Sequence, residues 1–226
     1  MNQAPRDLLA RVEGTLLDPG LTVAEADERL QAWSALGLRR VLTVPWLLGE
    51  LDAVGHPTLE FCGAVAFPAG GATLANKRME ILECLRLGAK AVTVTLTPGL
   101  VLAAGAAALE KEMSALLTTA PELHVRFLVD TGRVAQGPMT VLLRLLSSCR
   151  PTHLATADGV YSEPAGPENV AWLRARLTRK VKIAAHVRAL GPEGVAAFLA
   201  AGADVVATPA PELLAAPGGV PPGGAA

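Results

Sequence analysis

The sequence predicts a single-domain α/β protein, a (β/α)8 TIM barrel with eight parallel strands. Eight short runs rich in β-branched residues alternate with longer helical segments, and successive runs begin about 20 to 35 residues apart, as strand–helix–strand units require. No dinucleotide-type glycine loop opens any of the helical segments. Eight such units within 226 residues favour closure into a barrel over an open doubly wound sheet.

The expected strands are short and apolar. In chain order they are Val12–Leu16, Arg40–Val44, Phe61–Phe67, Ala91–Leu96, His124–Val129, Thr152–Thr156, Val181–Ala185 and Asp204–Thr208. The helical segments are Val23–Leu36, Trp46–Val54, Leu74–Leu87, Ala103–Thr118, Met139–Cys149, Glu168–Thr178, Glu193–Ala201 and a short Glu212–Ala215. The barrel is expected to span residues 1–216. The remaining residues, 217–226, are too rich in proline and glycine to pack and are expected to form a flexible tail.

Capping signals mark several helix boundaries. Thr22 followed by Glu25 is a capping box, in which each side chain satisfies an unpaired amide at the helix start. Three prolines suit first helical turns, where no amide partner is needed: Pro138, Pro167 and Pro192. Three glycines follow helix ends and take the left-handed conformation at low cost: Gly37, Gly88 and Gly202. Each of these glycines lies a few residues before an expected strand.

Composition and charge narrow the class of protein. The chain is 51% hydrophobic and only 4% aromatic, which predicts a large aliphatic core. A formal net charge of −1, with no Lys/Arg run longer than two, argues against a nucleic-acid-binding protein. No uncharged apolar run reaches the roughly 20 residues that span a bilayer, and the first 13 residues do not resemble a signal peptide. We therefore expect no membrane association and a cytoplasmic location.

Motifs for metal or cofactor binding are absent from the sequence. The three cysteines are scattered without a Cys-x-x-Cys pair, and no two histidines have the His-x-x-x-His spacing. There is no Walker sequence and no Gly-x-Ser-x-Gly elbow. The sequence therefore predicts no metal and no cofactor, and the sparse cysteines suit a reducing compartment.

Candidate reactive residues come from the inward faces of the expected strands. In a barrel the reacting groups lie at the carboxyl ends of strands, and alternation along each strand decides which side chains point inward. The ionisable residues expected to meet inside are Glu13, Arg126, Asp130 and Lys182. One interpretation is a polar pocket at the mouth, with Lys182 as nucleophile and Asp130 as proton carrier. The other is a paired structural network, since buried charges persist only when compensated.

The segments after the last two strands are where a barrel usually binds phosphate. They read Ala184-Ala185-His186-Val187-Arg188 and Ala207-Thr208-Pro209-Ala210-Pro211. Side chains replace the glycines that would let backbone amides approach an anion, and each proline removes a donor. His186, Arg188, Thr208 and Arg126 remain as candidates to bind a small anionic ligand. The alternative is that the loop residues among them have no ligand role.

The chain resembles the deoxyribose-phosphate aldolase family from about Val12 to Leu214. The clearest stretch is Ala66-Phe67-Pro68-Ala69-Gly70, followed by Thr73, Lys77, Glu80 and Gly88-Ala89. It is similar to the family's Phe-Pro-x-Gly turn, third helix and fourth strand. Asp130-Thr131-Gly132 is similar to the family's Glu-Thr-Gly after strand five, and Lys182 and Arg188 keep the spacing of its strand-seven lysine and the arginine beyond it.

The resemblance implies an aldolase barrel whose strand-six lysine forms an imine with deoxyribose 5-phosphate. A strand-seven lysine would lower the pKa of that amine, and a strand-four aspartate would relay protons. This chain departs from the pattern, because Ala155 stands at the imine lysine position and Thr93 at the aspartate position. Alanine cannot form an imine. Lys182 is the one remaining lysine expected on an inward face near the mouth.

Three hypotheses follow. The leading one is a catalytically degenerate barrel that serves as a binding, scaffold or regulatory protein for a protein partner or a small anionic ligand. The alternative is a lyase with altered chemistry, in which Lys182 forms an imine with a small carbonyl or sugar-phosphate substrate. Unchanged deoxyribose-phosphate aldolase activity is the third. The resemblance also implies a homodimer as a candidate oligomeric state.

Overall fold

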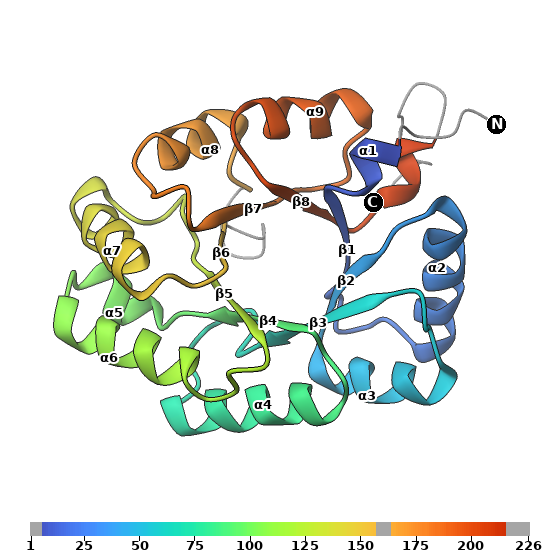
Figure 1. Ribbon diagram of the computed structural model, residues 1–226, viewed down its shortest axis with the longest axis horizontal. Helices are drawn as coiled ribbons and strands as arrows, with labels where there is room; N and C mark the ends of the chain where they lie inside the picture. The colour runs from blue at the N-terminus through green and yellow to red at the C-terminus, as the bar shows by residue number, and fades with distance from the viewer. Residues whose placement is uncertain (1–5, 157–163, 216–226) are drawn as a thin grey trace.

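The computed structural model describes residues 6–156 and 164–215. Its eight strands form a closed barrel in chain order, β1 to β8, and every neighbouring pair is parallel, including the closing pair β1 and β8. Figure 1 shows the strands at the centre and the helices in a ring around them. The predicted fold class, a single-domain (β/α)8 barrel, is confirmed.

The strands begin within about two residues of their expected positions. They are β1 Val12–Leu16, β2 Arg40–Thr43, β3 Glu60–Val65, β4 Ala91–Thr95, β5 His124–Leu128, β6 His153–Ala155, β7 Lys182–His186 and β8 Val205–Thr208. The helices are α1 Arg6–Leu9, α2 Val23–Leu36, α3 Pro45–Val54, α4 Leu74–Arg86, α5 Pro98–Leu102, α6 Ala106–Leu117, α7 Gln136–Cys149, α8 Pro167–Arg174 and α9 Pro192–Ala200, with a 3-10 turn at Pro211–Leu214.

One helix before β5 was not expected. The helix predicted from Ala103 to Thr118 is α6, Ala106–Leu117, and the separate helix α5, Pro98–Leu102, precedes it. Pro98 starts α5 at a position that needs no amide partner, and Ala104, with a φ of 52°, turns the chain before α6 begins. The short helix α1 was not predicted, because four residues are too few to show helical periodicity.

The capping signals act as predicted. Both hydrogen bonds of the Thr22–Glu25 capping box are present at the start of α2. Gly37, Gly88 and Gly202 have φ values of 93°, 85° and 106°, the left-handed region that glycine enters without a Cβ penalty. These glycines end α2, α4 and α9 sharply and direct the chain into β2, β4 and β8.

The core has two parts, one outside the barrel wall and one inside it. The larger part lies between the strands and the helix ring, where the approach is so close that a Cβ on Gly14 would lie 2.5 Å from the Trp33 ring. The inner part consists of two clusters of small and medium side chains: Leu42, Cys62, Ala64 and Ala91 in one, and Leu128, Ala155, Ala184 and Val205 in the other. Phe67 packs against both inner clusters. The interior is therefore filled, as in other barrels of this size.

Residues 6–156 and 164–215 contain neither a membrane-spanning helix nor a cluster of metal ligands. No helix there is long and apolar enough to cross a bilayer. No group of three or more histidine, cysteine or acidic side chains there is arranged to bind a metal ion. The predicted Pro/Gly tail and the segment Ala157-Asp158-Gly159 lie outside the described residues.

Candidate functional site

A buried ion pair crosses the barrel interior. Arg126 on β5 donates from Nη1 to Oε2 of Glu13 on β1 at 2.6 Å. Glu13 is fully buried and Arg126 is 6% exposed. Burial alone would lower the pKa of Arg126, but the Glu13 carboxylate beside it raises that pKa above its ordinary value. Arg126 therefore keeps its positive charge inside the barrel.

Two histidines inside the barrel are held in the neutral form. Burial, and then the positive charge of Arg126, lowers the pKa of His153 on β6 to about 3. Burial also lowers the pKa of His186 at the end of β7 to about 4. Neither imidazole is charged at neutral pH, so neither supplies a cation for an anionic substrate.

Cys62 lies inside the barrel, and its thiol is unreactive. Burial raises its pKa to about 11. Its Sγ lies 3.3 Å from Oγ1 of Thr93, the residue that the resemblance places at the family's aspartate position. At neutral pH the thiol stays protonated, so it is a packing group rather than a nucleophile.

Ala155, at the position where the resemblance places the imine lysine, lies in an apolar environment. It is fully buried on β6 and packs with Leu128, Ala184 and Val205, and Phe67 covers the same cluster from the β3–α4 connection. A side chain longer than alanine would have to displace these neighbours. The centre of the barrel at this level is filled with methyl groups and one aromatic ring.

The expected meeting of four charges is only partly correct. Glu13 and Arg126 meet, but Lys182 and Asp130 lie at opposite ends of the barrel. Lys182 is the first residue of β7, at the amino end of the strand, and its side chain is exposed. Its expected place near the mouth is therefore wrong. A long ammonium side chain gains by staying in water and avoids an interior that already holds the Arg126 cation.

The expected anion-binding residues differ in burial and in their partners. His186 is buried within the barrel, whereas Arg188, two residues further on, is exposed. Thr208 is fully buried, donates from Oγ1 to the Arg188 carbonyl at 3.4 Å, and accepts from the Ala210 amide at 3.3 Å. Arg126 is ion-paired with Glu13 through Nη1.

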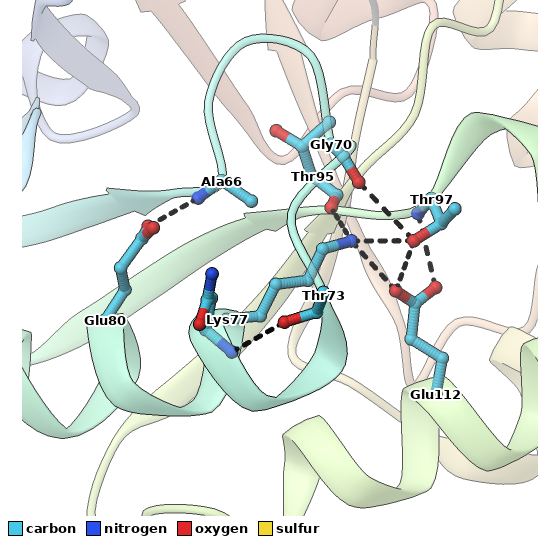
Figure 2. A network of polar contacts seen from close by, with 9 residues as sticks. Ala66, Gly70, Thr73, Lys77, Glu80, Thr95, Thr97 and Glu112 are labelled. Carbon is cyan, nitrogen blue, oxygen red and sulfur yellow. Dashed lines mark hydrogen bonds and ion pairs between the residues drawn. The ribbon is translucent and has the colours of Figure 1, made fainter.

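The residues of the family-like stretch hold the connection between β3 and α4. Oε2 of Glu80 accepts from the Ala66 amide at 2.7 Å, and Oγ1 of Thr73 accepts from the Asn76 amide at the start of α4. Gly70 has a φ of 66°, and a Cβ there would lie 2.5 Å from the Leu96 carbonyl. Figure 2 shows Glu80 bonded to Ala66 and Thr73 at the start of α4, at the two ends of the connection that carries Gly70. The stretch therefore positions backbone at the mouth of the barrel.

Lys77 is the centre of a polar network that the sequence reasoning did not assign. Its fully buried Nζ donates to the Thr95 carbonyl at 2.8 Å, to Thr97 Oγ1 at 3.0 Å and to Glu112 Oε1 at 2.8 Å (Figure 2). Glu112 also accepts from the Thr97 hydroxyl at 2.6 Å. The sequence did contain a signal for the burial of Lys77, because this residue shares one face of α4 with Ile81 and Cys84 at helical spacing.

A cavity of about 100 Å³ opens at the mouth, beside β4 and β5. Its lining is mostly apolar and comes from three connections: Pro68 and Ala69 after β3, Thr95 to Leu102 around α5, and Leu128 to Val134 after β5. Asp130, one of the predicted site residues, lines it together with Arg133. The sequence did not reveal this cavity, because the pairing of β3, β4 and β5 brings its walls together.

Known proteins of one family are similar to this chain over nearly its whole length. A deoxyribose-phosphate aldolase of Aeropyrum pernix is 26% identical over 213 residues, which cover 91% of this chain and 87% of the relative. One of Brevibacillus brevis is 21% identical over 198 residues, covering 87% and 90%. The chain is therefore similar to deoxyribose-phosphate aldolases at low identity. No family model matched the sequence.

Solved structures agree with this relationship at the level of the fold. A structure of the Aeropyrum pernix deoxyribose-phosphate aldolase, described as a unique tetramer, superposes with a TM-score of 0.83 at 22% identity and covers 91% of this chain and 88% of its own. The predicted resemblance to the deoxyribose-phosphate aldolases is confirmed. The roles predicted for Lys182, Asp130, Arg126, His186, Arg188 and Thr208 remain predictions.

Proposed function

We propose that this relative of the deoxyribose-phosphate aldolases is a catalytically degenerate barrel that binds a ligand or partner without performing the aldol reaction. The observation that carries the proposal is the environment of Ala155. The position where the resemblance places the imine lysine holds a methyl group, buried among Leu128, Ala184, Val205 and Phe67. Without a nucleophile at this point, an enzyme of this mechanism loses many orders of magnitude in rate.

The distribution of lysines supports the same proposal. The sequence contains five lysines, and all of them lie in described segments. Four are exposed: Lys90, Lys111, Lys180 and Lys182. The fifth, Lys77, is ion-paired with Glu112 between α4 and α6, outside the barrel. None of the five places an amine beside the position that an imine would occupy.

The retained family-like residues also favour a binding role. Lys77, Glu80, Thr73 and Gly70 fix the β3–α4 connection and the wall of the mouth cavity, and these contacts are independent of any reaction. A chain that keeps the residues supporting the mouth and lacks those that react there is suited to hold a molecule. The alternative lyase through Lys182 is disfavoured by the exposed position of that side chain at the amino end of β7.

The proposal is tested by a coupled assay for aldehyde release from deoxyribose 5-phosphate at high protein concentration. We expect no release above the background without protein, and the same result for the Lys182→Met variant. Activity in the unaltered chain that disappears in Lys182→Met would support the altered lyase. Activity that survives this substitution would refute both the degenerate barrel and the altered lyase that uses Lys182.

A further inference from the structure

The mouth cavity has the composition of a small-molecule site. It lies at the carboxyl ends of β4 and β5, the end of a barrel where ligands bind, and α5 covers one side of it. Leucine, valine, proline and alanine side chains supply most of its lining. Mostly apolar walls with few polar groups are typical of sites for small organic molecules.

Thr95 is one of three polar or charged residues in this lining, together with Asp130 and Arg133. Thr95 is 5% exposed, and its Oγ1 has no hydrogen-bond partner among the described residues. Its Cγ2 methyl lies against Gly70, where an added Cβ would approach it to 2.9 Å. A buried hydroxyl without a partner is unfavourable, and natural proteins keep such groups chiefly where a ligand, ion or water completes them.

The wall that carries Thr95 is fixed in advance. Its carbonyl accepts from Lys77 Nζ at 2.8 Å, and the next turn is tied to Glu112 through the Thr97 amide and hydroxyl (Figure 2). Gly70 packs against the Leu96 carbonyl on the same wall. A preformed wall reduces the entropy lost when a ligand binds, so even a small molecule can be retained.

Charge and size define the ligand class. Asp130 and Arg133 have opposite charges, so the lining has no net charge to compensate a buried ion, and burying an unpaired ion is costly. A cavity of about 100 Å³ is smaller than the engineered cavity of about 150 Å³ that accommodates benzene. The occupant must be neutral, compact and mostly apolar.

We propose that this cavity binds a small neutral molecule, apolar over most of its surface, whose single hydroxyl or carbonyl oxygen hydrogen-bonds to Thr95 Oγ1. A four-carbon alcohol or ketone has the required chemistry. The inference rests on the proposed function in one respect, that the mouth holds a molecule without converting it. The geometry of the cavity itself is independent of whether aldol chemistry occurs.

The test is a titration of the full chain with 2-butanone, 2-butanol and butyrate, followed by two-dimensional NMR. We expect saturable shifts for residues lining the cavity with the ketone and the alcohol, and none with the charged butyrate. Thr95→Val keeps the shape and removes the hydroxyl, so it should weaken binding about three- to tenfold, the effect of one neutral hydrogen bond.

Thr43→Val is the matched control. Thr43 is a buried strand threonine on β2 whose hydroxyl donates to the Leu16 carbonyl at 3.3 Å, and it does not line the cavity. This variant should bind the probes as the unaltered chain does but be less stable, whereas Thr95→Val should be no less stable, because it removes an unpartnered hydroxyl. The two stabilities are compared by urea unfolding.

Three results would overturn the inference: no saturable shift with either neutral probe, preference for butyrate, or equal affinity of Thr95→Val and the unaltered chain. None of these outcomes would restore aldol chemistry. Conversely, aldehyde release in the coupled assay would refute the degenerate barrel while leaving the binding data intact. The two failures are therefore distinguishable.

Discussion

At the scale of single residues, two lysines show how position in the fold decides whether an ammonium group is buried or exposed. Lys77 lies on the buried face of α4 and is compensated by Glu112 and two threonine oxygens. Lys182 alternates with Ala184 along β7, as a residue of the inner face does, yet it begins the strand and its ammonium reaches water. The alternation pattern predicted the face of β7 on which Lys182 lies, but it did not predict that Lys182 lies at the amino end of the strand.

Lys77→Met should reduce the free energy of unfolding by about 3 to 5 kcal/mol, because it leaves the Glu112 carboxylate buried without its cation. Urea unfolding measures the loss. The double variant Lys77→Met/Glu112→Leu should recover part of it, since no unpaired charge remains.

Lys111→Met, an exposed substitution on α6, is the control and should change stability by less than about 0.5 kcal/mol. Equal effects of Lys77→Met and Lys111→Met would mean that the network contributes nothing to folding.

At the scale of elements, the predictions succeeded wherever local rules decide the structure. All eight strands were expected within about two residues of where they begin, because β-branched runs between helix caps mark them directly. Helix α5 was missed, since five residues are too few to show helical periodicity. Ala104, which has a positive φ, separates α5 from α6, and the local sequence gives no sign of that conformation.

The β3–α4 connection provides a test at this scale. Gly70→Ala should destabilise the chain by about 2 kcal/mol or more, because an alanine there takes a left-handed conformation and its Cβ meets the Leu96 carbonyl. Thermal unfolding checks the direction.

The neighbouring Gly71→Ala meets no atom within 4 Å and should leave stability nearly unchanged. If the two variants unfold alike, the close packing of this turn against the mouth is not required for the fold.

At the scale of the whole molecule, the site could not be predicted from the sequence because closure of the barrel assembles it. The Glu13–Arg126 pair joins residues 113 positions apart, and the mouth cavity combines three separate connections. Alternation correctly put Glu13 and Arg126 on inner faces. It could not tell which end of the barrel each charged side chain would reach, so Asp130 and Lys182 were expected together.

The neutral interior histidines predict sensitivity to acid. The pKa values of His186 and His153, about 4 and 3, lie below the value of about 6.5 in the unfolded chain, so the unfolded state binds more protons below pH 6.5. Stability is fully present above that pH and falls as the pH drops toward 4 and 3, by on the order of 2 kcal/mol for each histidine at pH 5.

Urea unfolding between pH 7 and 5 measures this slope. His186→Gln should make it shallower, whereas His124→Gln, at an exposed strand start, should leave it unchanged. An unaltered slope in His186→Gln would show that the buried imidazole is not the cause.

The central claim is that this relative of the deoxyribose-phosphate aldolases lacks imine chemistry, and borohydride trapping tests it most directly. The full chain is incubated with deoxyribose 5-phosphate and, separately, with small aldehydes and ketones, then reduced and analysed by intact-mass and peptide mass spectrometry. The account predicts no adduct on Lys182 or Lys77 beyond the low labelling shared by the other exposed lysines. A stoichiometric adduct on Lys182 would contradict it.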